Sequence, residues 1–313
     1  MNNIITEKLA NIEFLKPQTH NNMSIIGFKT KNNNKIDFLT LNKGLNMGLV
    51  EIDEINEEGS VPELKVKNDA ITPLLLLDGE ELTGAKQNRI LNTTILIPEK
   101  SEITVPVSCT EAGRWDFTSK HFQDSGHIAS ATVRKGKTSS VSESLKTNKL
   151  YQSNQSKVWN DIANAERTLK VKTETGALRD IYTAQKENVD NYLKDFKYIK
   201  NQNGSLIFIN GEIIGMELIY NTYRYQEYHE KIIKSYILDA IQHIPLNTPK
   251  LDDTKLLDSA LNFINLTLNT KAKSYPSIGY GEDIRIENEN IFGSALTYQK
   301  ELIHTVLFKK LKA

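Results

Sequence analysis

The stretch LLLLDGEELTGAKQNRILNTTILIPEKSEITVPVSC, residues 74–109, combines apolar runs, a dense polar segment and a regular alternation. The runs at residues 74–77 and 95–97 have the length and composition of buried strands. A period-two alternation of apolar with polar residues, typical of a half-buried strand, follows at Ile103, Val105, Val107 and Cys109. Short strands at this spacing predict an antiparallel β-sandwich-like module in the N-terminal part of the chain.

Amphipathic helical patterns replace the strand patterns after residue 157. The third of four apolar stripes at helical spacing ends before Pro245. The first stripe consists of Val158, Ile162, Ala165 and Leu169. Strand patterns resume around Ile284 and Ile286. The chain is therefore predicted to have an α+β fold, in which the N-terminal antiparallel β-sandwich-like module is followed by helices packed with additional β-hairpins.

Three dipeptides are predicted to form tight hairpin turns between strands. Asp78-Gly79 and Asn210-Gly211 tolerate the positive φ angles that such turns require, and Gln299-Lys300 is a weaker candidate. A glutamate follows each dipeptide, at Glu80, Glu212 and Glu301. The pattern agrees with a degenerate internal repeat and equally with the general similarity of hairpins.

Residues 118–157 differ in composition from the rest of the chain. They are rich in Ser, Thr, Lys and Gln and contain few large apolar residues. We predict a polar flexible loop or linker there, with a lid that orders on ligand as the alternative. The loop would separate a β-rich module, residues 1–117, from a mixed helical and β-hairpin part, residues 158–313, unless the two form one continuous domain.

Composition and charge argue against several classes of protein. Lys plus Arg equals Asp plus Glu, 39 each, so a broad surface for nucleic acid or anionic membrane is not expected. Cys109 is the only cysteine, which rules out an intrachain disulfide and a cysteine-based zinc site. No apolar run approaches the roughly 20 residues of a membrane span, and no signal-peptide pattern is present. We therefore expect a cytoplasmic protein without a membrane partner.

The polar segment between the two apolar runs is the first candidate site. It contains carboxylates that can act as a general base or hold a divalent ion, and side chains that can donate to an anion or to ribose hydroxyls. These residues are Glu80, Glu81, Lys86, Gln87, Asn88, Arg89 and Asn92. The alternative is structural: Arg89 can pair with Glu80 or Glu81, and the rest can close loops at the end of the strands.

A second candidate site, CTEAGRW, follows the alternating strand at residues 109–115. Glu111, Arg114 and Trp115 offer a carboxylate, a guanidinium group and a stacking surface, which together suit a nucleotide-like ligand. Cys109 continues the apolar face of the strand, so we expect a buried small hydrophobe rather than a nucleophile. His304 shares a strand face with apolar residues and is expected in the core.

Residues 74–115 resemble the signature of the ARG and rhodanese-phosphatase-superfamily-associated protein domain family, in which ARG denotes ADP-ribosylglycohydrolase. The resemblance rests on DGE, GAKQNR, the NTT before a strand and VPVSCTE-GRW. The later INGEIIGMEL and GSALTYQKELIHTVLF extend it over most of the chain. It implies a role in ADP-ribose or NAD metabolism without an assigned reaction. It also gives functional weight to Glu80, Gln87, Asn88, Arg89, Asn92, Cys109, Glu111, Arg114 and Trp115.

These observations predict a protein that binds or processes an ADP-ribose or NAD-derived nucleotide. Glu80 and Glu111 are the candidate catalytic residues. The two candidate sites are expected to converge on one cavity. The ligand-binding residues are predicted to be Lys86, Gln87, Asn88, Arg89, Asn92, Arg114 and Trp115. The alternative is a non-catalytic binding or scaffold module that assembles with ADP-ribosylglycohydrolase or phosphatase partners. We assign no metal-binding residues, and the cofactor and the presence of catalysis stay open.

Overall fold

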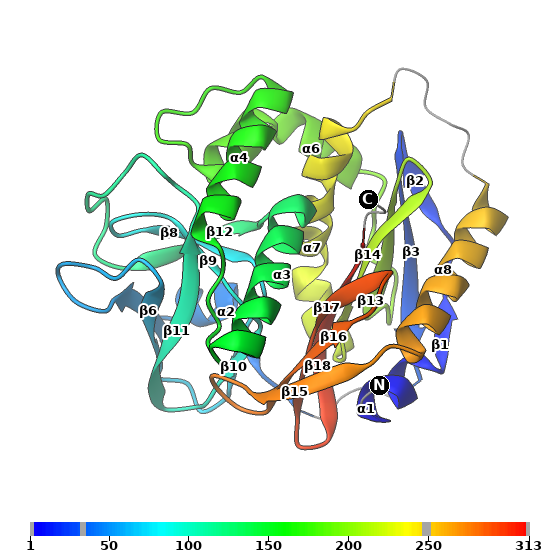
Figure 1. The fold of residues 1–313 in the computed structure, drawn as a ribbon, viewed down its shortest axis with the longest axis horizontal. Helices are drawn as coiled ribbons and strands as arrows, with labels where there is room; N and C mark the ends of the chain where they lie inside the picture. Colours follow the sequence, from blue (N-terminus) through cyan, green and yellow to red (C-terminus); the bar gives the residue numbers. More distant parts are fainter. Residues whose placement is uncertain (1–2, 32–35, 246–251, 311–313) are drawn as a thin grey trace. The chain divides into compact units, whose positions relative to one another are not determined.

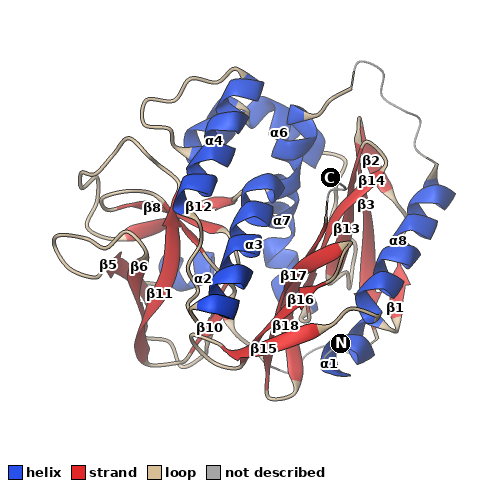
Figure 2. Cartoon of the chain, viewed as in Figure 1, coloured by secondary structure: helices blue, strands red, loops and turns tan. Residues whose placement is uncertain are grey.

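A computed structural model of the chain describes residues 3–31, 36–245 and 252–310 (Figure 1). The chain has the predicted α+β fold, with a strand-rich N-terminal region (Figure 2). It divides into two compact units, which we describe separately. Unit 1 consists of residues 1–36, 188–277 and 281–313, and unit 2 consists of residues 37–187 and 278–280. These limits lie away from the predicted ones at residues 117 and 158.

Within the described residues, unit 1 contains one antiparallel sheet of nine strands and three helices that belong wholly to it. A further helix, α6 (Lys186–Leu193), begins in unit 2 and ends in unit 1. The other elements are α1 (Asn3–Leu9), β1 (Ile12–Phe14), β2 (Gln18–His20), β3 (Met23–Thr30), β13 (Gly204–Ile209), β14 (Glu212–Ile219), α7 (Thr222–Gln242), α8 (Asp253–Leu268), β15 (Ala272–Pro276), β16 (Glu282–Glu287), β17 (Ile291–Tyr298) and β18 (Glu301–Lys309). The strand order is β1-β3-β13-β14-β18-β17-β16-β15, with β2 paired to β3.

The two faces of this sheet are covered by different helices. Met216 and Leu218 of β14 lie in an apolar core with residues of α1 and α8. Glu217, between them, points to the opposite face, where the Tyr236 hydroxyl of α7 donates to its carboxylate at 2.9 Å. His304 is buried beside the same carboxylate, with Nε2 3.2 Å from Glu217 Oε2, so its predicted place in the core is confirmed.

Two of the three predicted hairpins are confirmed in unit 1. Asn210 and Gly211 have φ angles of +53° and +79° and join the paired ends Ile209 and Glu212. Gln299-Lys300 likewise has φ angles of +50° and +62° between paired strands β17 and β18. Positive φ at both central residues is the geometry of the tightest hairpin turn.

All residues of unit 2 are described, and strands dominate its first part. A six-stranded antiparallel sheet has the order β12-β8-β9-β11-β6-β5, and a small second sheet has the order β10-β7-β4. The elements are β4 (Leu39–Thr40), α2 (Leu41–Asn46), β5 (Val50–Glu54), β6 (Glu63–Asn68), β7 (Leu74–Leu76), β8 (Glu80–Gly84), β9 (Arg89–Leu91), β10 (Ile95–Ile97), β11 (Ser101–Cys109), β12 (Phe122–Ile128), α3 (Ala131–Thr147), α4 (Gln155–Leu169) and α5 (Leu178–Ala184).

The six-stranded sheet curls around its own apolar core. Its end strands, β12 and β5, pack against each other. Apolar residues such as Leu64, Val66 and Val105 fill the interior that the curled sheet encloses. The predicted strand around Val105 is β11, which pairs with β6 up to Pro106 and with β9 from Val107 onward. A separate β-bridge joins Leu96 of β10 to Tyr280, in the three-residue part of unit 2.

Asp78-Gly79 forms a tight turn but not a hairpin. The Glu80 amide donates to the Leu77 carbonyl at 3.1 Å, and Gly79 has a φ of +78°. The flanking strands, however, belong to different sheets: β7 pairs with β10 and β4, and β8 pairs with β12 and β9. The hairpin prediction was wrong here because a local turn motif does not specify which strands pair after it.

Residues 118–157 are not the predicted loop or linker. They contain strand β12, the whole of helix α3 (residues 131–147), the connection from α3 to α4, and the start of α4. The apolar periodicity of α3 is weak because several residues on its buried face are polar, among them Arg134, Lys137 and Thr138. A pattern search for apolar stripes therefore misses this helix. Among the described residues, no helix is both long and apolar enough to cross a membrane.

Candidate functional site

The DGE segment binds helix α3 through buried polar contacts. Lys137 of α3 is fully buried and forms an ion pair with the Asp78 carboxylate, and its ammonium also donates to the Asn92 carbonyl at 2.9 Å. The Thr138 hydroxyl donates to Asp78 Oδ2 at 3.3 Å. We call Asp78, Asn92, Lys137 and Thr138 the Asp78 cluster. The two charged groups of this cluster, the Asp78 carboxylate and the Lys137 ammonium, form an ion pair with each other.

The other members of the DGE segment have local structural contacts as well. Glu80 is fully buried, and its Oε2 accepts from the Leu77 amide at 2.7 Å, which closes the turn. A Cβ at Gly79 would lie 2.9 Å from Cγ of Arg134, so only glycine permits this approach of α3. Asn92 donates to the carbonyls of Val107 and Tyr151 at 3.2 and 3.0 Å.

A second buried group lies at one end of the curled sheet. Arg89 is fully buried, and its Nη1 donates to Gln87 Oε1 at 2.7 Å and lies 2.9 Å from Cys109 Sγ. Its Nη2 lies 4.0 Å from Glu54 Oε1. We call Glu54, Gln87, Arg89 and Cys109 the Arg89 cluster. Within the described parts of the chain, Arg89 Nε and Nη2 and Glu54 Oε2 have no hydrogen-bond partner.

Cys109 is buried, as predicted from its place on the apolar face of β11. Burial raises the pKa of its thiol to about 11, and the nearby Arg89 guanidinium offsets only part of that effect. The thiolate is the reactive form of cysteine, so the thiol is inert at neutral pH.

Aromatic side chains lie over the Arg89 cluster. The Trp115 ring centroid is 5.5 Å from Arg89 Cζ and 5.5 Å from Lys86 Nζ, and the Phe117 centroid is 5.0 Å from Lys86 Nζ. Both aromatic residues are exposed, Trp115 by 42% and Phe117 by 53%. Lys86 Nζ also donates to the Glu58 carbonyl at 2.8 Å. These contacts stabilise the loop through cation–π interactions.

A cavity of about 480 Å³ lies beside β8, and we call it the Glu111 cavity. It is formed by the end of β8, the segment that follows β11, part of β12 and the start of α5. Its lining residues are Thr83, Gly84, Asn88, Glu111, Arg114, Thr118, Ser119, Gln123, Glu174, Thr175, Ala177, Arg179 and Asp180. Backbone contacts hold the two sides together, because Glu111 forms a β-bridge with Ala177 and the Gly113 amide donates to the Thr175 carbonyl at 2.7 Å.

Three donors hold the Glu111 carboxylate in this cavity. Oε2 accepts from Arg114 Nη2 at 2.6 Å and from the Asn88 amide at 3.2 Å, and Oε1 accepts from the Thr175 hydroxyl at 2.7 Å. Burial raises the pKa of Glu111, but these hydrogen bonds outweigh burial and the net pKa lies below the ordinary value. Glu111 is therefore ionised at neutral pH and suited to accept a proton or a ligand hydroxyl.

The two arginines of the Glu111 cavity differ in their contacts. Arg114 binds the surrounding loops, since Nη1 donates to the carbonyls of Ala85 and Asp116 at 2.7 and 2.8 Å. The Arg179 guanidinium, at the start of α5, makes no hydrogen bond or salt bridge to any residue that the structure describes. Arg179 is exposed and therefore available to an anionic ligand.

Glu81 is a buried carboxylate on the strand that borders the cavity. Its Oε1 accepts from the Thr110 hydroxyl at 2.9 Å. Burial raises the pKa of Glu81 to about 7, although hydrogen bonds from Thr110 and Ser125 lower it in part. Glu81 and Glu111 thus differ in protonation near neutral pH, as acid and base pairs in enzymes do.

The residues predicted to form one site fall into three neighbouring groups in unit 2. Asn88, Glu111 and Arg114 line the Glu111 cavity. Lys86, Gln87, Arg89 and Trp115 belong to the Arg89 cluster or its aromatic cover, and Gln87 Nε2 links the two groups by donating to the Glu111 carbonyl at 2.5 Å. Glu80 and Asn92 lie with the DGE turn and the Asp78 cluster.

Sequence reasoning did not identify the α5 side of the cavity. Thr175, Arg179 and Asp180 lie more than 60 residues from Glu111 along the chain, and no local spacing connects them. Gln123 fell within the segment predicted as a loop. Long-range contacts, such as the β-bridge between Glu111 and Ala177, bring these parts together, and such pairing leaves no periodic signal.

Comparison with known proteins assigns the chain to a family but not to a characterised relative. No curated protein and no solved structure shows significant similarity to it. One family model matches residues 11–308, which is nearly the whole chain. The chain therefore belongs to the family of the ARG and Rhodanese-Phosphatase-superfamily-associated Protein domain, ARPP-1.

Proposed function

We propose that the Glu111 cavity of unit 2 binds an ADP-ribose or NAD-derived nucleotide. The observation that carries this proposal is the position of Arg179, an exposed guanidinium that makes no hydrogen bond or salt bridge to the described residues, in the same cavity as the ionised Glu111. Guanidinium groups bind phosphate through paired hydrogen bonds. The family name, which records an association with ARG, agrees with this class of ligand.

Each part of such a ligand has a matching group in the cavity. Arg179 would bind the diphosphate, and the Glu111 carboxylate would accept hydrogen bonds from ribose hydroxyls. The side-chain amides of Asn88 and Gln123 can donate to ligand oxygens or accept from its hydroxyls. Arg114 would act indirectly, because it holds Glu111 and the loop around Ala85 in place.

A carboxylate that is ionised at neutral pH also suits processing of the ligand, and Glu111 would serve as the general base. Glu81, whose pKa is about 7, is fully buried and is not among the residues that line the cavity, so it would influence Glu111 through its charge and not by direct contact with the ligand. Glu80 is the weaker of the predicted catalytic residues because its carboxylate is bound to its own turn.

Calorimetric titration of ADP-ribose into the full chain tests the proposal. A charged hydrogen bond contributes about 1.5–3 kcal/mol, so Arg179→Ala should weaken binding about tenfold or more without lowering the melting temperature. Arg167→Ala is the matched control, because Arg167 is another unit 2 arginine whose guanidinium donates to Asn164 at 2.7 Å on the surface of α4, away from the lining of the Glu111 cavity. Absence of binding by the wild type, or equal loss in both variants, would refute the proposal.

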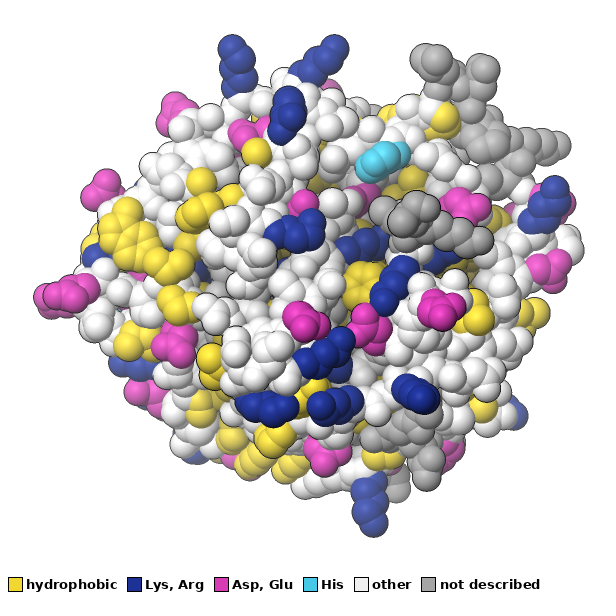
Figure 3. Space-filling model, in the orientation of Figure 1, with side chains coloured by type: hydrophobic (Ala, Val, Ile, Leu, Met, Phe, Trp, Pro, Cys, Tyr) yellow, Lys and Arg dark blue, Asp and Glu magenta, His cyan; other side chains and the backbone are white. Residues whose placement is uncertain are grey.

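A second candidate function is a scaffold that assembles with ADP-ribose-processing enzymes. Exposed Trp115, Phe117 and Val61 favour it, because large exposed apolar side chains are common at protein interfaces. Figure 3 shows hydrophobic side chains gathered over the region of β6 and β8. Under this alternative, Phe117→Ala would weaken association with an ADP-ribosylglycohydrolase in analytical ultracentrifugation, while Arg179→Ala would have no effect on that association.

A further inference from the structure

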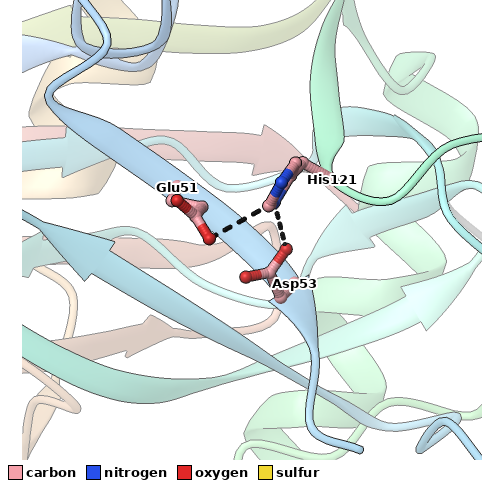
Figure 4. A group of neighbouring side chains, drawn as sticks. All are labelled: Glu51, Asp53 and His121. Atoms are coloured by element: carbon pink, nitrogen blue, oxygen red, sulfur yellow. Dashed lines mark hydrogen bonds and ion pairs between the residues drawn. The ribbon is translucent and has the colours of Figure 1, made fainter. Parts of the chain in front are cut away.

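Three side chains with metal-binding atoms converge on the outer face of the curled sheet. Glu51 and Asp53 lie on β5, and His121 lies just before β12 (Figure 4). His121 Nδ1 is 2.6 Å from Asp53 Oδ1 and 3.3 Å from Glu51 Oε1. Each residue offers one such atom, and all three atoms lie within 4.8 Å of one another. None of the three residues lines the Glu111 cavity.

The local fold explains why these side chains share one face. Burial alternates along β5, so Val50, Ile52 and Glu54 point inward while Glu51 and Asp53 point outward. His121 reaches the same place because β12 and β5 are the two ends of the curled sheet and pack against each other. The group therefore depends on the curling of the sheet and not on proximity in sequence.

The two carboxylates form no salt bridge with the lysines that stand opposite them, although Lys67 interacts with Glu51 electrostatically. Lys67 and Lys65 of β6 stand opposite Glu51 and Asp53 in the strand register. These lysines bind other carboxylates, however: Lys67 pairs with Asp69 at 2.8 Å and Lys65 with Glu102 at 3.9 Å. One imidazole carries at most one positive charge, whereas two carboxylates carry two negative charges. A divalent cation would remove this imbalance.

We propose that Glu51, Asp53 and His121 bind a divalent transition metal, for which Zn²⁺ is the best match. Imidazole nitrogen and carboxylate oxygen are both common zinc ligands, at about 2.0–2.2 Å. Ligands at that distance in a tetrahedron stand roughly 3.3 Å apart. The separation of His121 from Glu51 already has that value, and that of His121 from Asp53 must widen slightly. The partial exposure of all three side chains leaves room for this adjustment.

Metal binding has two further consequences at this place. Three protein ligands leave at least one coordination position for water, as in catalytic rather than structural zinc sites. The bound ion would also connect the two end strands of the sheet and thereby stabilise unit 2.

Isothermal titration of Zn²⁺ into metal-stripped full-length protein tests the proposal. We expect one Zn²⁺ per chain, and a melting temperature that rises with Zn²⁺. Glu51→Gln, Asp53→Asn and His121→Asn should each weaken binding at least about tenfold, since even outer-shell partners of metal ligands have effects of that size. Glu51 is half-exposed, so the first variant should fold normally.

His20→Asn is the matched control. His20 also forms a short contact with a carboxylate, 2.6 Å from Asp195 Oδ2, but with one carboxylate instead of two. Zn²⁺ affinity should be unchanged in this variant, and Ca²⁺ should not replace Zn²⁺ because calcium prefers ligands that are all oxygen. The proposal fails if Zn²⁺ does not bind with saturation, if the three substitutions leave affinity unchanged, or if His20→Asn has the same effect as His121→Asn.

Discussion

The Asp78 cluster and the Glu111 cavity are two polar regions of unit 2 built partly from the same signature segment, residues 74–115, yet they differ in what their polar groups contact. In the Asp78 cluster, Lys137 and Thr138 from α3 satisfy the carboxylate of Asp78. In the Glu111 cavity, Arg179 makes no hydrogen bond or salt bridge to a described residue, and space is left beside it. The density of polar residues in a sequence therefore does not distinguish a ligand site from a buried structural network. The distinction depends on whether a distant element supplies the partners.

Removal of the Lys137 ammonium should have the largest effect. Lys137→Met removes the nearer of the two buried cations beside the Asp78 carboxylate and leaves only Arg134 Nε, 4.0 Å away. Breaking one side of a buried ion pair costs about 3–5 kcal/mol of unfolding free energy. Urea denaturation measures the loss. Lys146→Met, on the same helix, is the control because Lys146 is half-exposed and pairs at the surface with Glu143. Equal stability of the two variants would show that α3 does not depend on the Asp78 cluster.

The pH dependence of stability should reveal the buried state of Glu81. Its pKa is about 7 in the folded protein and 4.5 ordinarily, so the folded protein holds this proton more tightly than the unfolded chain. Stability from this group is therefore greatest below the ordinary pKa and falls as pH rises from about 4.5 to about 7, by about 3 kcal/mol in total. In Glu81→Gln, the unfolding free energy measured by denaturation should depend less on pH over this range. The surface variant Glu102→Gln should keep the pH dependence of the wild type. A slope unchanged in Glu81→Gln would contradict the assignment.

Replacement of Arg114 should affect both the stability of the protein and the binding of ligand. Arg114→Ala removes hydrogen bonds to Glu111 and to the Ala85 carbonyl, so we expect a stability loss of about 1.5–3 kcal/mol together with weaker ADP-ribose binding. Thermal melts and titration on the same samples separate this result from that of Arg179→Ala, which should affect binding alone. Loss of binding with full stability would mean that Arg114 contacts the ligand directly.

Replacement of Trp115 should have the smallest effect. Trp115→Ala removes a half-exposed ring from above the Arg89 guanidinium, and a cation–π contact of this kind contributes about 0.5–1 kcal/mol. Denaturant titration detects a change of this size. Phe117→Ala, which removes a ring from Lys86 but not from Arg89, should cost less. A loss of several kcal/mol in Trp115→Ala would place the ring inside the core of the loop.

Local patterns predicted the elements whose packing follows a simple period. The alternation around Val105 identified β11, Asn210-Gly211 identified a hairpin, and the apolar face of β11 placed Cys109 in the interior. The α5 side of the Glu111 cavity could not be predicted this way. Its α5 residues come from a separate segment, and residues of α3 are buried although polar, so neither leaves an apolar period in the sequence.

The turn at Asp78-Gly79 also shows that long-range packing decides which strands pair. Asp78-Gly79 has the composition of a hairpin turn, and the turn itself is present. Its strands separate into different sheets because their partners, β10 for β7 and β12 for β8, are set by packing at longer range. The glutamates that follow the three turns also differ, since Glu80 is buried against its turn while Glu212 pairs with Lys309. This difference weighs against an internal repeat.

The division of the chain into discontinuous units has a consequence for its synthesis on the ribosome. Strand β3, near the start of the chain, pairs with β13, which is made only after the whole 37–187 part of unit 2. Unit 2 can thus assemble almost completely in the nascent chain while β3 still lacks that neighbour. An unpaired strand edge attracts other strands, so this interval is when the nascent chain is most exposed to mispairing with another copy of itself.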